Sequence, residues 1–162
     1  MNIGLALTAV IVVTTPGAPS LSSPQRQALV EAYRAGYHVG LPLTFMAIVY
    51  VESSLCQRDT GDDGLAFGCS QVHASAAYAA TGMRIPAWML TDPNFNDVNM
   101  AVGAKYLSMC MARFGWPAGI GCYQQGIPHS YALGRWRLNT LPYTRRVLAA
   151  MQWLKQLPIS ED

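Results

Sequence analysis

The sequence predicts an all-α fold with at most a small β-hairpin, and three observations support this. Apolar residues recur at helical spacing through most of the chain, and no alternating strand pattern is convincing outside the N-terminal arm. Proline and glycine bound the helical segments, as they do where helices begin and end. The 162 residues, 51% of them hydrophobic and 12% charged, suit one packed domain, and no repeat or linker divides the chain.

The first 22 residues differ from the rest, and we expect an apolar N-terminal arm (1–22) followed by the helical domain (23–162). The apolar run from Ile3 to Val13 is too short to span a bilayer. It has the length of a signal-peptide core, but no basic residue precedes it. It therefore has three interpretations: an uncleaved signal, a membrane anchor, or an arm that docks on a partner protein.

The first two helices are predicted from their opening residues. Ser23-Pro24 suits an N-cap and first helical residue. Pro42 suits the first turn of a second helix that extends to about Ser53. Because nearly every residue from Leu43 to Val51 is apolar, this helix should run through the core without a solvent face.

The remaining elements follow from turn residues and helical spacing. The segment from Gln57 to Gly64 holds two glycines and three aspartates, which predicts an exposed loop, with the small hairpin if there is one. Helices are predicted over His73 to Ala80, from Asp92-Pro93 to near Gly115, over about Ala118 to Gln124, from Pro128 onward, and over Leu141 to Leu157, with a short turn beginning at Ile85.

Charge and cysteine content limit the function classes. The net charge of +2 is too small to indicate a nucleic-acid partner. Basic residues dominate from Lys105 onward. They predict either a solvated helix face or a basic surface that faces an anionic polymer or membrane. The residues of that surface would be Arg135, Arg137, Arg145 and Arg146.

The four cysteines show no zinc-finger or CxxC spacing. The pairs Cys56–Cys69 and Cys110–Cys122 would be sensible disulfides in an oxidising compartment, and four buried thiols are the alternative. His38, His73 and His129 lack metal-ligand spacing, so we expect neither a metal site nor a cofactor.

Glu52 is the candidate catalytic residue that the pattern itself singles out. It is the carboxylate that ends an apolar helix, where both the surroundings and the last-turn carbonyls disfavour its charged form. Its pKa should therefore be raised, as a general acid near neutral pH requires. The alternative is a structural carboxyl bonded to loop amides.

Four motifs, in order over about Ala28 to Lys155, resemble those of the lytic transglycosylases of peptidoglycan, in their soluble-type catalytic domain. The family patterns are Glu-Ser at the end of a buried helix, Gly-Leu-Met-Gln with an aliphatic residue, an Asn helix leading to Gly-Ala-x-Tyr-Leu and then Tyr-Asn-Ala-Gly, and Glu-Thr-x-x-Tyr before Arg-Val-Leu. The matching residues are Val51-Glu52-Ser53; Gly68-Cys69-Ser70-Gln71-Val72; Asn99 with Gly103-Ala104-Lys105-Tyr106-Leu107 and Tyr123-Gln124-Gln125-Gly126; and Asn139-Thr140-Leu141-Pro142-Tyr143 with Arg146-Val147-Leu148.

The resemblance implies a lysozyme-like transglycosylase domain that cleaves the glycan strands of peptidoglycan, with Glu52 as acid and base. Gly68 and Ser70 belong to the motif that contacts the sugar. Ser53 and Gln71 would hydrogen-bond Glu52 or the sugar, Tyr123 and Gln124 would orient the substrate, and Tyr143 would place its hydroxyl near Glu52. The resemblance implies one of two settings. The protein would belong either to a phage virion that acts in the bacterial periplasm, or to a secretion or conjugation machine in the periplasm or cell envelope. In both settings the N-terminal arm would dock on partner proteins.

The sequence departs from the family pattern at specific positions. Cys69-Ser70 replaces Leu-Met, Gln124 replaces Asn, and Asn139 replaces Glu. These changes affect the expected substrate preference and rate more than the reaction class.

Two other functions stay open. Goose-type lysozymes share the first two motifs and place an Asp nine residues before the Gln, which is the position of Asp62. Asp62 or Asp63 could then activate water on the opposite face of the sugar, giving a hydrolase. The third interpretation is an inactive glycan-binding or structural subunit of a larger assembly.

Overall fold

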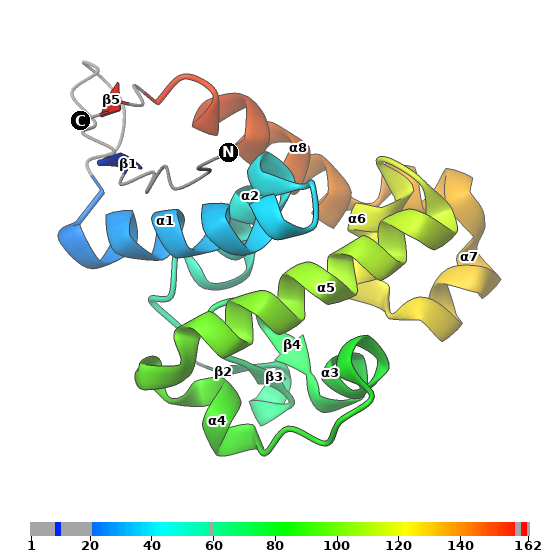
Figure 1. The fold of residues 1–162 in the computed structure, drawn as a ribbon. Helices are drawn as coiled ribbons and strands as arrows, with labels where there is room; N and C mark the ends of the chain where they lie inside the picture. The colour runs from blue at the N-terminus through cyan, green and yellow to red at the C-terminus, as the bar shows by residue number, and fades with distance from the viewer. Residues whose placement is uncertain (1–8, 11–20, 59, 158–159, 162) are drawn as a thin grey trace, which may run out of the picture.

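A computed structural model describes residues 9–10, 21–58, 60–157 and 160–161. The described residues form eight α-helices and short β-strands, with the long helix α5 (Asn96–Phe114) crossing the middle of the molecule (Figure 1). The prediction of a mostly helical chain is confirmed. Most of the predicted N-terminal arm lies outside the described residues. Its described parts are Ala9–Val10 (β1) and the last two residues, Leu21 and Ser22. β1 pairs antiparallel with Ser160–Glu161 (β5).

The first two helices agree closely with the sequence prediction. α1 spans Ser23–His38 and α2 spans Pro42–Ser53. The N-cap of α1 is Ser22 rather than the predicted Ser23, because the Ser22 hydroxyl accepts from the Gln25 N–H while the Gln25 side chain accepts from the Ser22 N–H. As expected, α2 has no solvent face over most of its length, since every residue from Thr44 to Val49 is buried.

The backbone turns sharply after α2. Ser54, Leu55 and Cys56 all have φ between 55° and 63°, the left-handed region that costs a non-glycine residue about 1 kcal/mol or more. Three features hold this turn: Leu55 is fully buried, Cys56 is in a disulfide with Cys69, and the Cys56 N–H donates to the Ser53 hydroxyl at 2.8 Å. These contacts therefore hold the turn that follows the end of α2, where Glu52 lies.

The aspartate-rich segment forms a small antiparallel sheet, with one strand more than the predicted hairpin. Its strands are β2 (Thr60–Gly61), β3 (Ala66–Phe67) and β4 (Val72–His73), in the order β2-β3-β4. A 3-10 turn at Asp62–Gly64 connects β2 to β3. Ala66 lies opposite both Gly61 and His73, so these three residues lie side by side across the sheet.

The rest of the chain is helical. Asp92 caps a 3-10 turn, Pro93–Phe95, so α5 begins at Asn96 rather than at the predicted Pro93. α8 (Pro142–Leu154) ends three residues before the predicted Leu157, and α7 (Ile127–Thr140) is kinked at Gly134, where φ is 73°. The remaining helices are α3 (Ala74–Thr81), α4 (Ala87–Thr91) and α6 (Ala118–Gln125).

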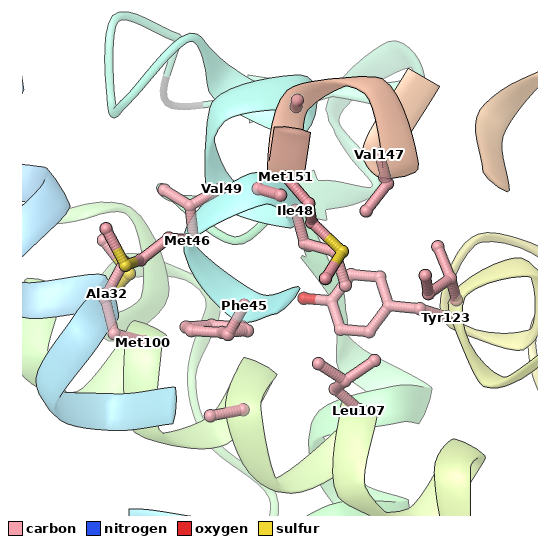
Figure 2. Packing of buried hydrophobic residues seen from close by; sticks show 14 of the residues in the cluster. Ala32, Phe45, Met46, Ile48, Val49, Met100, Leu107, Tyr123, Val147 and Met151 are labelled. Atoms are coloured by element: carbon pink, nitrogen blue, oxygen red, sulfur yellow. The ribbon is translucent and has the colours of Figure 1, made fainter. Parts of the chain in front are cut away.

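The main core is formed by buried residues of α1, α2, α5, α6 and α8. Phe45, Ile48 and Leu107 are fully buried there, and Figure 2 shows the ring of Tyr123 reaching into the same cluster. Both expected disulfides are present: Cys56–Cys69 joins the turn after α2 to the segment before β4, and Cys110–Cys122 joins α5 to α6. None of the helices in the described residues combines the length and apolar character needed to cross a bilayer.

Gly103 on α5 provides a test of this packing. A Cβ added there would lie 2.6 Å from the Ser70 hydroxyl and 2.9 Å from that of Tyr123. Helix propensity alone favours alanine by about 1 kcal/mol. We nevertheless expect Gly103→Ala to destabilise the protein by about 1–3 kcal/mol in urea unfolding, because overpacking outweighs propensity. Ala112→Gly, at an exposed position of the same helix, is the control and should cost only its propensity. A more stable Gly103→Ala protein would contradict the packing described.

Candidate active site

Glu52 lies at the last turn of α2, where its carboxyl is largely buried yet lines a cleft. Burial raises its pKa from 4.5 to about 7, which confirms the expected direction. The hydroxyl of Tyr143 donates to Oε1 at 2.5 Å and opposes that rise, because it stabilises the charged form. The negative charge of Asp62 raises the pKa further, and the positive charges of Arg146 and Arg58 lower it. Desolvation is the largest of these effects, so Glu52 is partly protonated near neutral pH.

Tyr143 is positioned by α8. Pro142 begins that helix, and Tyr143 in its first turn is buried against α2, 91 residues away from Glu52 in sequence. Burial and the adjacent carboxyl raise the pKa of Tyr143 well above 10, so the phenol keeps its proton and acts as a donor. The guanidinium of Arg146, one helical turn later, lies 5.9 Å from the centre of its ring.

The cleft has a volume of about 610 Å³ and is lined by residues of α2, the small sheet, α3, α5, α6, α7 and α8. The end of α2 and the first turns of α8 form one wall, and the small sheet with the start of α3 forms another. α6 and the beginning of α7 close it. The lining side chains that can donate or accept hydrogen bonds are Glu52, Arg58, Asp62, Gln71, His73, Ser75, Tyr106, Tyr123, Gln124, Gln125, His129, Tyr143 and Arg146.

The structure brings most of the predicted site residues together and leaves four outside the cleft. Glu52, Asp62, Gln71, Tyr123, Gln124 and Tyr143 all line it. Ser53, Gly68 and Ser70 are buried and Asp63 is exposed, and none of these four is part of the lining.

The predicted substrate role of Ser53 does not agree with its hydrogen bonds. Its hydroxyl donates to the Val49 carbonyl at 3.1 Å and accepts from the Cys56 N–H at 2.8 Å. The side chain is fully buried and holds the left-handed turn after α2. Ser53 therefore positions the end of the helix and does not contact a ligand in the cleft.

Ser70 also has a structural position rather than the predicted sugar contact. Its N–H and its hydroxyl each donate to Asn99 Oδ1 at 2.8 Å, and its carbonyl accepts from the Tyr123 hydroxyl at 2.7 Å. Asn99 is fully buried and also donates to the carbonyls of Phe67 and Leu90. This network is satisfied throughout, as buried polar groups must be.

The network places Gln71 in the cleft. Gly68 sits so close to Asn99 that a Cβ there would lie 2.5 Å from Asn99 Nδ2, and its φ of 67° favours glycine. Gln71 itself has φ of 48°, and its amide donates to the Gly68 carbonyl at 2.8 Å. The amide oxygen keeps its acceptor capacity for a ligand. Gly68 and Ser70 thus help to position Gln71 and do not line the cleft themselves.

Several residues of the cleft were not predicted as site residues. His73 Nε2 lies 2.9 Å from Asp62 Oδ2, and this is the one ion pair within the described residues when the histidine is protonated. The pair depends on strand register, which the sequence does not reveal. Arg146 was predicted in a basic face and in the fourth motif, and Gln125 in the third motif, but neither was assigned a role at the site. Arg58 was not singled out, and His129 was noted only because it lacks metal-ligand spacing.

Comparison with protein-family models, with curated proteins and with solved structures finds no match for this chain. Within the described residues, no group of three or more His, Cys, Asp or Glu side chains could hold a metal ion. A carboxyl with a pKa of about 7 can donate a proton to a bound ligand and accept one back at the same pH.

The raised pKa of Glu52 predicts a pH dependence of stability. The contribution of the neutral carboxyl is complete below pH 4.5 and is lost as the pH rises through 7, because the unfolded chain ionises first. Relative to Glu52→Gln, which stays neutral, the wild-type protein should lose about 3 kcal/mol of unfolding free energy between pH 4.5 and pH 8. Urea titrations across this range measure the difference. Asp63→Asn, at an exposed carboxyl, should follow the wild-type profile; parallel profiles for Glu52→Gln and wild type would contradict a raised pKa.

The bond from Tyr143 can be tested separately. Tyr143→Phe removes the donor that stabilises the carboxylate, so the pKa of Glu52 should rise above its value of about 7. A carboxyl-carbon NMR titration of the labelled glutamate measures the shift. Tyr106→Phe removes another hydroxyl of the same cleft that does not bond Glu52, and it should leave the titration unchanged. A lower pKa in Tyr143→Phe would overturn the assigned role.

Proposed function

We propose that the protein is a peptidoglycan lytic transglycosylase with a lysozyme-like fold and Glu52 as its catalytic residue. The reaction would break the β-1,4 bond between N-acetylmuramic acid and N-acetylglucosamine and close a 1,6-anhydro ring on the muramoyl residue. One observation carries the proposal. A buried carboxyl, with its pKa raised to about 7 and hydrogen-bonded by a buried tyrosine, faces an amide- and aromatic-lined cleft.

In the first step, protonated Glu52 gives its proton to the glycosidic oxygen as the bond from that oxygen to the muramoyl C1 breaks. The glucosaminyl part leaves with a free hydroxyl, and the positive charge on C1 is stabilised by the substrate's own acetamido group. Glu52 is now a carboxylate, and the Tyr143 hydroxyl stabilises this form through its hydrogen bond.

In the second step, the carboxylate takes the proton of the muramoyl C6 hydroxyl as that oxygen attacks C1. The new C1–O6 bond closes the anhydro ring and Glu52 returns to its starting state, so no water is consumed. Gln71 and Gln124 have amides in the cleft for the acetamido and ring hydroxyl groups. Tyr123, whose ring packs in the core and whose hydroxyl donates to the Ser70 carbonyl, supports the wall of the cleft and does not orient the substrate as the sequence predicted.

A hydrolase is the second candidate, and one observation favours it. Asp62 lines the same cleft as Glu52, its charge raises the pKa of Glu52, and it is exposed to the water that a hydrolase needs. In this alternative Asp62 would take a proton from water as the water attacks C1, and the product would carry a reducing end. The pairing of Asp62 with His73 leaves one carboxylate oxygen available for that role.

The biological setting follows from the substrate. Peptidoglycan is reached in the bacterial periplasm or cell envelope, so we propose local cell-wall degradation by a phage virion or by a secretion or conjugation machine. Docking through the N-terminal arm is part of this proposal, and the arm lies outside the described residues except at Ala9–Val10, Leu21 and Ser22.

Digestion of purified murein tests the proposal. We expect the wild-type protein to release muropeptides with 1,6-anhydro ends, identified by mass spectrometry as 18 Da lighter than reducing ends, and to incorporate no oxygen from ¹⁸O-labelled water. Glu52→Gln should lower the rate about 100- to 10,000-fold, the usual range for a general acid. Asp62→Asn should keep the anhydro products, with Asp63→Asn as its matched control.

The same experiment separates the alternatives. Reducing ends labelled with ¹⁸O, lost in Asp62→Asn, would establish the hydrolase instead. No cleavage by the wild-type protein, together with unchanged murein binding by Glu52→Gln, would favour a non-catalytic glycan-binding subunit.

A further inference from the structure

The chain from Lys105 to Leu157 carries charge of one sign only. It holds seven lysines and arginines and no aspartate or glutamate. Within the part of the chain that the structure describes, the one ion pair joins His73 to Asp62, so none of these seven cations is neutralised by a carboxylate there. This positive charge can therefore attract an anionic surface.

Three large aromatic side chains are exposed in the same part of the chain. Trp116, Tyr131 and Trp136 are 61%, 65% and 76% exposed. None of the three lines the cleft, so ligand binding there does not account for their exposure. Because aromatic rings gain free energy when water is removed from them, a group of exposed rings indicates a surface that binds something.

Contacts between α5 and α7 bring this group together. The Tyr131 ring packs on Phe114 with ring centres 5.0 Å apart, and the Arg135 side chain donates to the Phe114 carbonyl. A Cβ added at Gly115, the residue before Trp116, would lie 2.8 Å from the Arg135 guanidinium. We call the exposed residues of these two contacting segments the aromatic-basic surface: Arg113, Trp116, Tyr131, Arg135, Trp136 and Arg137. Figure 1 shows α7 at the edge of the molecule, away from α4.

The composition of the aromatic-basic surface favours a lipid bilayer as its partner. Tryptophan and tyrosine concentrate at the headgroup level of membranes, and arginine is attracted to anionic headgroups. A protein partner would need pockets that match the protruding rings, and a single-stranded nucleic acid would need a basic groove to follow. A bilayer accepts protruding side chains without a matching pocket, and its charge is spread evenly like that of this surface.

We propose that the aromatic-basic surface docks the protein on a membrane that contains anionic phospholipid. The three aromatic rings would enter the headgroup region, and the guanidinium groups of Arg113 and Arg137 would pair with lipid phosphates. The surface lies outside the cleft lining, so this inference does not depend on the reaction proposed for Glu52.

Sedimentation with lipid vesicles tests the proposal. The whole chain is mixed with vesicles of phosphatidylcholine alone, or of phosphatidylcholine and phosphatidylglycerol in equal parts. We expect binding to be roughly tenfold tighter to the anionic vesicles, and this preference to disappear in about 0.5 M NaCl. Because Met1 to Ser20 has no charged side chain, binding through the N-terminal arm would not distinguish the two lipids. Equal binding to both vesicles, or binding to neither, would overturn the proposal.

Paired substitutions locate the surface. Trp136→Ser with Arg137→Gln should weaken binding to the anionic vesicles about tenfold, because the pair removes one ring and one charge. Trp88→Ser with Arg84→Gln removes the same two kinds of exposed side chain at and beside α4, and this matched control should leave binding unchanged. An equal loss in both pairs would contradict a localised surface. Neither pair lines the cleft, so digestion of murein in solution should stay the same in both.

Fluorescence quenching separates insertion into a bilayer from attraction to any polyanion. Phosphatidylcholine brominated on its acyl chains, mixed with phosphatidylglycerol, should quench the tryptophan emission of the bound wild-type protein. Trp116→Ser with Trp136→Ser should remove most of this quenching, whereas Trp88→Ser should keep it. Quenching that survives the first pair would overturn the assignment of the rings. Binding to dextran sulfate without binding to anionic vesicles would indicate a polymer partner and would overturn the membrane.

Discussion

The hydrogen bond from Tyr143 to Glu52 is the interaction on which the site depends. α2 carries the carboxyl into a desolvated position, and burial alone would favour the neutral acid strongly. The phenol of Tyr143 opposes this by stabilising the carboxylate, while its own pKa is too high for it to lose the proton. The pKa near 7 is therefore the difference between a large desolvation effect and a smaller hydrogen-bonding effect, and it requires α2 and α8 to keep their contact.

The opposite wall depends on close backbone approaches. A Cβ at Gly61 would lie 2.2 Å from the amide oxygen of Gln71, and one at Gly68 would meet Asn99. Since Asn99 and Tyr123 hold Ser70 from two different helices, the small sheet is fixed to α5 and α6 by buried hydrogen bonds. The Cys56–Cys69 disulfide then joins this wall to the turn after α2. The cleft is thus built from short segments joined by these bonds rather than from any single helix.

The sequence predicted the helices and several cleft residues because both depend on local patterns. Apolar runs and proline positions located α2 and α8 to within a few residues, and the end of an apolar helix located Glu52. The sequence did not separate cleft residues from their neighbours: Ser53 and Ser70 adjoin Glu52 and Gln71 but face inward. Left-handed φ values at Ser54, Leu55, Cys56 and Gln71 decide these orientations, and such values in non-glycine residues arise from tertiary constraints. The Asp62–His73 pair was missed for a related reason, because it depends on the register of two-residue strands.

The two carboxyls of the cleft have opposite environments, and this difference constrains their chemistry. Glu52 is desolvated, whereas the Asp62 side chain is 72% exposed and has a histidine partner at 2.9 Å. Solvent stabilises the charge of Asp62, and that charge acts across the cleft to hold the proton on Glu52. Asp62 therefore supports an acid at Glu52 without touching it. A carboxylate that contributes to the pKa of its neighbour in this way has a role in the proposed one-carboxyl mechanism as well as in the two-carboxyl alternative. Both proposals use Glu52 as the acid.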